Sequence, residues 1–214
     1  MPVNTALPHA LDPLTDDLRL RRALLPLADE PAGPGWNLDE IDDVIDPSTL
    51  VNAAVLVGLV PRPEGAHVLL TRRNDSLHRH AGQVSFPGGR IDPGDRSAMD
   101  AALRETWEEV AIASGEIEPV GFLDPYTTIT GFHVLPLVAR LAPDYRARPN
   151  PDEVAAAFEV PLAPLLAGDH LVRTPAQWRG RPRHYWEYQV GPHRIWGATA
   201  AMLVNLARRL GAAL

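Results

Sequence analysis

The chain has 214 residues, 45% of them hydrophobic and 22% charged, and a formal net charge of −7 at pH 7. This acidic balance argues against an extended nucleic-acid-binding groove, although a few Arg residues can still hold a small phosphate-bearing ligand. The absence of Cys excludes disulfides, Cys-ligated zinc and a Cys nucleophile, and no apolar run reaches the roughly 18 residues of a membrane span, so we expect a cytoplasmic protein with neither a nucleic-acid nor a membrane partner.

The first 48 residues mix a helical pattern with stretches rich in Pro and Gly. Residues 16–27 are predicted to form a helix because four Leu residues recur there at helical spacing. The segment DEPAGPGW that follows predicts a loop. We interpret residues 1–48 as an arm that packs on, or extends from, a main domain at 49–214. A partly disordered tail fits the same composition.

The rest of the chain alternates strand and helix patterns, which favours one α/β or α+β domain. A continuous apolar run at 51–60 predicts a buried strand. The turn PRPEG and a second apolar run at 67–72 extend this prediction to a hairpin. The remaining predictions are strands at 119–124 and 132–141 and helices at 151–157 and 197–211.

The segment 82–112, GQVSFPGGRIDPGDRSAMDAALRETWEEVAI, is the richest in residues that can carry chemistry. PGG predicts a tight turn, and Ser97 is the predicted N-cap of a helix that ends near Val110. At about 100° per residue, one face of this helix carries Glu105, Glu108 and Glu109. The opposite face is expected to pack on the core and carries Met99, Leu103, Thr106 and Val110. One turn earlier, the carboxylate side is expected to be open at Ala98, Ala101 and Ala102.

Three carboxylates on one helix turn repel one another by roughly a few tenths of a kcal/mol per exposed pair, and by more when they are partly desolvated. A divalent cation removes this repulsion, and hard oxygen ligands suit Mg²⁺ or Mn²⁺, which often bridge to substrate phosphates. Arg104, four residues before Glu108, is able to hold one carboxylate in position. A solvated acidic face also explains three glutamates, so the surrounding spacing has to decide.

That spacing resembles the signature of the Nudix hydrolases, in which a Gly is followed by an acid, then by Arg-Glu, two residues and Glu-Glu. Here the acid is Asp95 rather than Glu, and eight residues rather than seven separate it from Arg-Glu. Thr106 and Ala111 stand where the family has an aliphatic residue and a Gly. The signature reads Gly89, Asp95, Arg104-Glu105 and Glu108-Glu109.

Residues 69–89, LLTRRNDSLHRHAGQVSFPGG, resemble an additional motif of the coenzyme A pyrophosphatase branch, which also has the shifted Asp and the extra residue. The resemblance implies hydrolysis of the diphosphate of coenzyme A or a derivative, giving 3′,5′-ADP and 4′-phosphopantetheine or its acyl form. One alternative is a broader pyrophosphohydrolase acting on ADP-ribose, NADH or a nucleotide. Another is a Nudix-like binding module without catalysis.

The resemblance also implies a fold and a metal site. The fold is an α/β/α sandwich with a mixed central sheet and a loop–helix–loop diphosphate site. Mg²⁺ or Mn²⁺ would be held by Glu105, Glu108 and Glu109 together with the carbonyl of Gly88. The catalytic group would contain Arg104 and Glu108, with Glu105 or Glu153 as the general base. A homodimer is compatible with the superfamily.

The substrate of that branch carries several phosphates, so the resemblance implies a basic rim beside the signature. Its expected members are Arg72, Arg73, Arg79 and His80, with Gly89 letting the backbone approach the diphosphate. Each Arg taken alone is also explained as an ordinary surface residue. Phe86, Tyr126 and Phe132 are able to stack on adenine, but core packing explains each of them too.

Overall fold

The computed structural model describes residues 16–75 and 82–214. Its central sheet consists of β1 (Val51–Arg62), β2 (Gly65–Arg73), β3 (Val84–Ser85), β4 (Gly88–Arg90), β5 (Ile117–Phe122), β6 (Tyr126–Thr127), β7 (Phe132–Leu141) and β8 (Val154–Pro161). The helices are α1 (Asp17–Ala23), α2 (Ala98–Val110), α3 (Leu162–Ala167) and α4 (Ala198–Arg209). A second sheet consists of β9 (Leu171–Trp178), β10 (Arg181–Val190) and β11 (His193–Trp196).

The central sheet is mixed, with the strand order β3-β2-β1-β7-β5. The long strands β1 and β7 run parallel, whereas β1 and β2 form the predicted antiparallel hairpin. The short strand β4 pairs with the first half of β1, and β8 pairs with β2. The expected strand at 132–141 matches β7, and the one at 119–124 matches β5 shifted by two residues.

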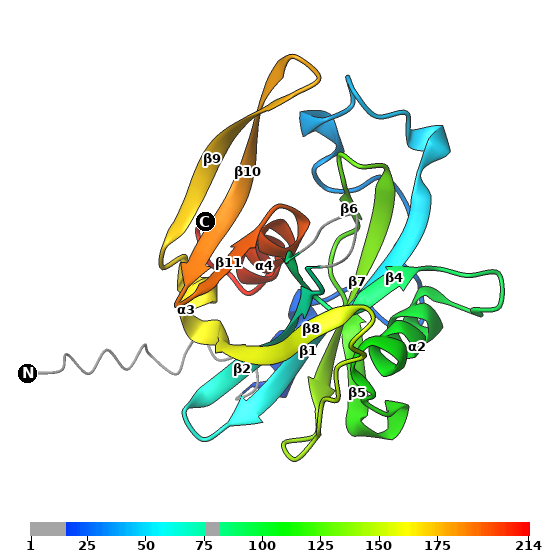
Figure 1. The fold of residues 1–214 in the computed structure, drawn as a ribbon, viewed down its shortest axis with the longest axis vertical. Helices are drawn as coiled ribbons and strands as arrows, with labels where there is room; N and C mark the ends of the chain where they lie inside the picture. Colours follow the sequence, from blue (N-terminus) through cyan, green and yellow to red (C-terminus); the bar gives the residue numbers. More distant parts are fainter. Residues whose placement is uncertain (1–15, 76–81) are drawn as a thin grey trace, which may run out of the picture.

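Two apolar cores cover the two faces of this sheet, as Figure 1 shows with α2 on one side and α4 on the other. The core beneath α4 also contains residues of α1, α3 and β10. Leu203 and Leu206 of α4 are fully buried there, and each buried side chain of this size stabilises the fold by about 1.5–3 kcal/mol. The predicted α/β/α sandwich with a mixed central sheet is confirmed.

Helix α2 begins and ends where the sequence predicts, but it is rotated relative to our expectation. Ser97 caps it by accepting a hydrogen bond from the Asp100 N–H, 3.0 Å away. The alanines that we expected on an open side are buried against the sheet: Ala98, Ala101 and Ala102. Of the face expected in the core, Thr106 and Val110 are fully buried, whereas Met99 and Leu103 are only partly buried. The small alanines let the helix approach the sheet closely, so the face that carries Glu105 and Glu109 turns inward.

The helix predicted at 151–157 is wrong, because residues 154–161 form β8. This segment pairs antiparallel with β2, for example Val68 with Val160. Ala-rich sequence favours a helix locally, but the free edge of β2 offers a full ladder of hydrogen bonds, and this tertiary pairing prevails. The second sheet, β9 to β11, was not predicted by any pattern.

The N-terminal arm contacts the domain over its described part. Helix α1 begins at the Asp16 cap, ends earlier than predicted, and places Leu20 and Leu24 in the core. The chain then extends, because Leu25 bridges to Phe122 of β5. Residues 1–15 lie outside the described residues, and the boundary at 48/49 stays a prediction. Within 16–75 and 82–214, no helix has both the length and the apolar character needed to cross a bilayer.

Candidate active site

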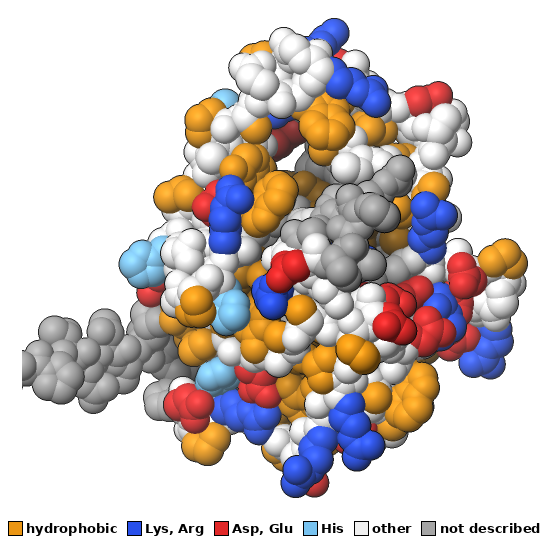
Figure 2. Space-filling model, viewed as in Figure 1, with side chains coloured by type: hydrophobic (Ala, Val, Ile, Leu, Met, Phe, Trp, Pro, Cys, Tyr) orange, Lys and Arg blue, Asp and Glu red, His pale blue; other side chains and the backbone are white. Residues whose placement is uncertain are grey.

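The inward face of α2 meets the glycine strand β4. Gly88 has φ +149°, a conformation that side chains disfavour, and a Cβ there would collide with the backbone of β1. A Cβ on Gly89 would lie 2.5 Å from the carboxyl carbon of Glu105. The two glycines therefore let the backbone of β4 lie directly against the Glu105 carboxylate. Figure 2 shows acidic side chains, with basic ones among them, gathered over this part of the molecule.

Arg104 organises the acidic groups around it. Its guanidinium donates to both carboxylate oxygens of Asp95 at 2.9 Å, to Glu105 Oε1 at 2.9 Å and to Glu108 Oε2 at 3.0 Å. It also donates to the Arg90 carbonyl at 3.0 Å. Hydrogen bonds from Arg104 lower the pKa of Asp95. The predicted hold on Glu108 is present, and the same side chain also ties the loop after β4 to α2.

Glu109 is a buried carboxylate without a full set of partners. It is 4% exposed, and its Oε2 atom has no hydrogen-bond partner. Burial raises the pKa of Glu109 to about 8, with the neighbouring carboxylate of Glu105 as the next largest cause. Arg73, whose Nη1 lies 4.0 Å from Glu109 Oε1, opposes this shift. Burial also raises the pKa of Glu105, despite its bond to Arg104.

Glu153 joins this acidic centre from the loop before β8. The Asn150 N–H donates to the carbonyl of Glu109 at 2.8 Å, which fixes the loop at the end of α2. The Asn74 N–H donates to the carbonyl of Glu153 at 2.8 Å, which ties it to the end of β2. The Glu153 carboxylate is close enough to raise the pKa of both Glu105 and Glu109.

The donor set fits a hard divalent cation, although no three His, Asp or Glu side chains in the described part of the chain are grouped tightly enough to hold an ion as they stand. Arg104 binds the carboxylates of both Glu105 and Glu108. The unpartnered oxygen of Glu109 and the raised pKa values of Glu105 and Glu109 mark a surplus of buried negative charge. Such a surplus is what a bound cation neutralises.

The predicted basic rim is brought only partly to this centre. Arg73 faces Glu109, and its Nε is buried without a partner. Arg72 instead pairs with Asp75 at 2.9 Å. Arg79 and His80 lie outside the described residues. The sequence reasoning missed Asn150, which anchors the Glu153 loop through its backbone and carries no motif signal.

A second missed residue is Glu30 of the arm, whose carboxylate accepts a hydrogen bond from the Ala98 N–H at the start of α2. A negative group at a helix N-terminus stabilises the helix. Nothing in the local sequence links Glu30 to α2. The arm therefore contributes to the position of the helix that carries the glutamates.

The three aromatic side chains considered for base stacking differ in exposure. Phe86 is 2% exposed and belongs to the core. Tyr126 packs against Trp36, with ring centres 6.0 Å apart, and burial raises the pKa of its hydroxyl to about 12. Phe132 is half-buried, and the guanidinium of Arg90 lies over its ring.

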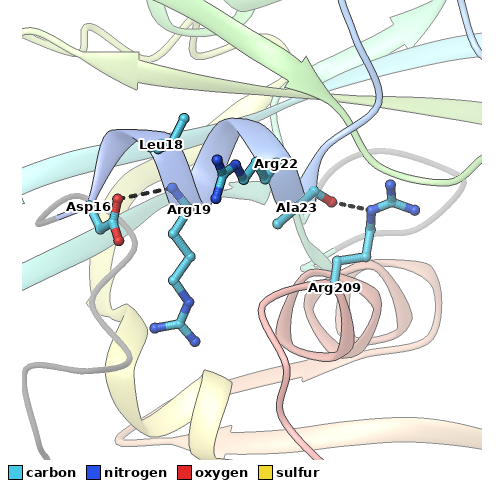
Figure 3. A pocket seen from close by; sticks show the side chains of 6 residues that line it. All are labelled: Asp16, Leu18, Arg19, Arg22, Ala23 and Arg209. Atoms are coloured by element: carbon cyan, nitrogen blue, oxygen red, sulfur yellow. Dashed lines mark hydrogen bonds between the residues drawn. The ribbon is translucent and has the colours of Figure 1, made fainter.

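A cavity of about 380 Å³ lies between α1 and the end of α4, apart from the acidic centre (Figure 3). Two of its three Arg side chains donate to main-chain carbonyls. Arg209 Nε donates to the Ala23 carbonyl, and Arg19 donates to the Leu210 carbonyl at 2.5 Å. These contacts fasten the arm to α4, which is a structural role.

Comparison with known proteins bears on the same segments. A family model described as "NUDIX domain" matches residues 52–179. A protein of Escherichia coli strain K12 described as "Uncharacterized Nudix hydrolase NudL" is 42% identical over 159 residues, which cover 74% of this chain and 82% of the relative. The protein of Cronobacter sakazakii with the same description is 43% identical over 159 residues, with the same coverage.

Solved structures also resemble the chain. A Caenorhabditis elegans Ap4A hydrolase binary complex is 25% identical, with a TM-score of 0.45, over 53% of this chain and 82% of that one. The NUDIX domain of Shewanella oneidensis NrtR in complex with ADP ribose is 23% identical, with a TM-score of 0.43, over 60% of this chain and 85% of that one.

Proposed function

Since the chain belongs to the Nudix hydrolase family, we propose that it hydrolyses the diphosphate bond of coenzyme A or one of its derivatives. The products would be 3′,5′-ADP and 4′-phosphopantetheine or its acyl form. One observation carries the choice of substrate. The motif at 69–89, which resembles the coenzyme A pyrophosphatase branch, contributes Arg73, Gly88 and Gly89 to the surroundings of Glu105 and Glu109.

A diphosphate resists hydrolysis because its negative oxygens repel an attacking water. Nudix hydrolases generally use divalent metal ions such as Mg²⁺ or Mn²⁺. Here Glu105, Glu108 and Glu109, with the carbonyl of Gly88, would hold such an ion, whose charge would offset that of the diphosphate oxygens. Arg104 would keep the carboxylates of Glu105 and Glu108 in position through the hydrogen bonds described above.

We assign the general base to Glu153, with Glu105 as the other candidate. No described residue donates a hydrogen bond to the Glu153 side chain, whereas Glu105 is bound by Arg104. A carboxylate with free lone pairs is better able to accept a proton from the attacking water. Arg73 would contribute positive charge beside Glu109, where the diphosphate approaches the end of β2.

The direct test offers coenzyme A, dephospho-coenzyme A, ADP-ribose and NADH to the purified protein with Mg²⁺ and, separately, Mn²⁺, and identifies the products by mass spectrometry. We expect release of 3′,5′-ADP from coenzyme A, with slower turnover of the others. Faster turnover of ADP-ribose or NADH would replace the proposed substrate by the broader pyrophosphohydrolase function. Absence of hydrolysis with all four compounds would contradict the catalytic proposal.

The base is tested separately by Glu153→Gln and by its neighbour Asp152→Asn, which serves as the control. Loss of a general base lowers kcat by about 10²–10⁴ and removes the acidic limb of the pH profile. We expect this result for Glu153→Gln and near-normal activity for Asp152→Asn. If Glu153→Gln retains its activity while Glu105→Gln loses it together with the acidic limb, Glu105 is the base.

A further inference from the structure

Arg90 directly follows the glycine pair but points to the other side of the sheet. In the antiparallel pairing of β4 with β1, Gly89 lies opposite Ala54 and Arg90 lies opposite Ala53. Ala54 belongs to the core beneath α2, and Ala53 belongs to the core beneath α4. Since neighbouring residues of a strand face opposite sides, Gly89 faces the acidic centre while Arg90 faces away from it.

The position of β4 lets one ligand contact both the face of the sheet at Gly89 and the opposite face at Arg90. Among the described residues, β4 pairs only with β1, so its second edge has no strand partner there. Successive Cα atoms are about 3.8 Å apart, so the side chain of Arg90 begins within one residue of the backbone that faces Glu105. A ligand with its diphosphate at Gly89 is therefore able to place a second group, a few bonds away, beside Arg90.

The guanidinium of Arg90 lies over an aromatic ring and has no acidic partner among the described residues. Its central carbon lies 5.6 Å from the centre of the Phe132 ring, and the residue is exposed. Within 16–75 and 82–214, no carboxylate forms an ion pair with it, whereas Arg72, Arg73 and Arg104 each lie beside an acid. The ring restrains one face of the guanidinium and leaves its N–H groups able to donate.

We propose that Arg90 binds the second phosphate of the substrate, the 3′-phosphate on the ribose, and thereby distinguishes coenzyme A from dephospho-coenzyme A. The inference rests on the proposed function for the identity of the substrate. A phosphate monoester carries up to two negative charges and accepts the paired N–H donors that a guanidinium presents. Phe132 is the positioning residue, because its ring sets where the guanidinium lies.

The test compares Arg90→Gln and Phe132→Leu with the wild type, and Arg22→Ala serves as the control. Arg22 is an exposed Arg of α1, a helix that contacts β5, and its removal changes the net charge by the same amount. We expect Arg90→Gln to lower kcat/KM for coenzyme A by about tenfold to a hundredfold, the cost of losing charge-assisted hydrogen bonds, mainly through KM. Turnover of dephospho-coenzyme A should change little, and Phe132→Leu should show a smaller effect of the same kind.

Binding of 3′,5′-ADP and of AMP, measured by calorimetry, separates this inference from the proposed function. The wild type and Arg22→Ala should bind 3′,5′-ADP more tightly than AMP, and Arg90→Gln should lose that difference. If coenzyme A is hydrolysed but Arg90→Gln keeps the preference for the 3′-phosphate, or loses affinity for both nucleotides equally, the inference is wrong and the function stands. If the binding difference depends on Arg90 but no diphosphate is cleaved, the function is wrong and the phosphate site stands.

Discussion

Two carboxylates, Glu109 of α2 and Glu159 of β8, are in opposite situations. Glu109 lies near Glu153, at the start of β8; its Oε2 has no partner, and burial raises its pKa to about 8. Glu159, near the end of β8, is partly buried, and burial alone would raise its pKa. Hydrogen bonds from Arg62, at 2.8 and 2.5 Å, and from Tyr145, at 2.7 Å, outweigh that effect and lower the pKa of Glu159.

Glu109 is the more deeply buried of the two, with a side chain 5% exposed against 20% for Glu159, and its Oε2 lacks the hydrogen-bond donors that Glu159 has. A buried carboxylate that the fold supplies with donors contributes to stability, whereas one left short of them carries a free-energy cost. Such a cost is typical of functional sites, where a ligand completes the set of partners. We therefore expect substitution of Glu109 to affect activity, and substitution of Glu159 to affect stability.

The largest expected effect comes from Glu109→Gln. Hydrolysis should fall by at least about a hundredfold, because the amide cannot supply the charge that a cation needs. The fold should be retained, since the amide has the size of the carboxyl group and cannot ionise in the buried position. Steady-state kinetics and circular dichroism measure the two properties. A variant that remains active, or one that fails to fold at neutral pH, would contradict the contrast between Glu109 and Glu159.

Gly89→Ala sharpens the contrast by displacing a carboxylate without removing it. The added Cβ would press on the Glu105 carboxyl group, and a displacement of about 1 Å near a reacting group can cost a hundredfold in rate. We therefore expect kcat to fall by about tenfold to a hundredfold, with little change in melting temperature. Gly94→Ala is the matched control, because a Cβ there meets open space. Equal activity of the two variants would count against contact between β4 and Glu105.

Glu159→Gln should have the opposite pattern. It leaves Arg62 and Tyr145 without their charged partner, at a cost of about 1–2 kcal/mol in the free energy of unfolding, and leaves activity unchanged. Denaturant titration measures the cost. Glu64→Gln is the control, because Glu64 is 65% exposed and lies 3.5 Å from its partner His67. A loss of activity equal to that of Glu109→Gln would remove the distinction.

The smallest expected effect concerns the stability of the metal-free protein, which Glu109 and Glu159 should make pH-dependent in opposite directions. Glu109 keeps its proton up to a pH of about 8 when folded but only to about its ordinary value of 4.5 when unfolded, so stability falls as the pH rises through this window. Glu159 has a lowered pKa, so its contribution is present above 4.5 and is lost as the pH falls below that value.

Thermal unfolding of three proteins at several pH values checks both signs. The advantage of Glu109→Gln over the wild type should grow from pH 5 to pH 8, and the deficit of Glu159→Gln should shrink below pH 4.5. If the stability of both variants relative to the wild type changed with pH in the same direction, Glu109 and Glu159 would not differ in their hydrogen-bond partners as described.

Local signals in the sequence were sufficient for much of the fold. The Ser97 cap, the end of α2 at Val110, the β1–β2 hairpin and β7 all follow from side-chain chemistry or periodicity within one segment. What failed depends on contacts between distant segments. β8 pairs with the edge of β2, and the second sheet packs on α4 with Tyr188 and Ile195 in the core.

The site shows the same division. The motif spacing brings together Glu105, Glu108 and Arg104, because they lie on consecutive turns of one helix. The burial of Thr106 and Val110 was predicted, but that of the alanine face of α2 was missed, because close packing of alanines on a sheet is a tertiary preference that an apolar periodicity does not reveal. The approach of Glu153 depends on a loop anchored to the end of α2, which the sequence of that loop alone does not indicate.

The central claim is that the unpartnered carboxylate of Glu109 belongs to a cation site, and calorimetric titration with Mn²⁺ tests it most directly. Wild type and Glu159→Gln should bind the ion with similar affinity. Glu109→Gln, shown by circular dichroism to be folded, should bind it at least tenfold more weakly, as loss of a charged ligand implies on the order of 1.4 kcal/mol or more. Equal affinity of all three proteins for Mn²⁺ would contradict the assignment of Glu109 to a cation site.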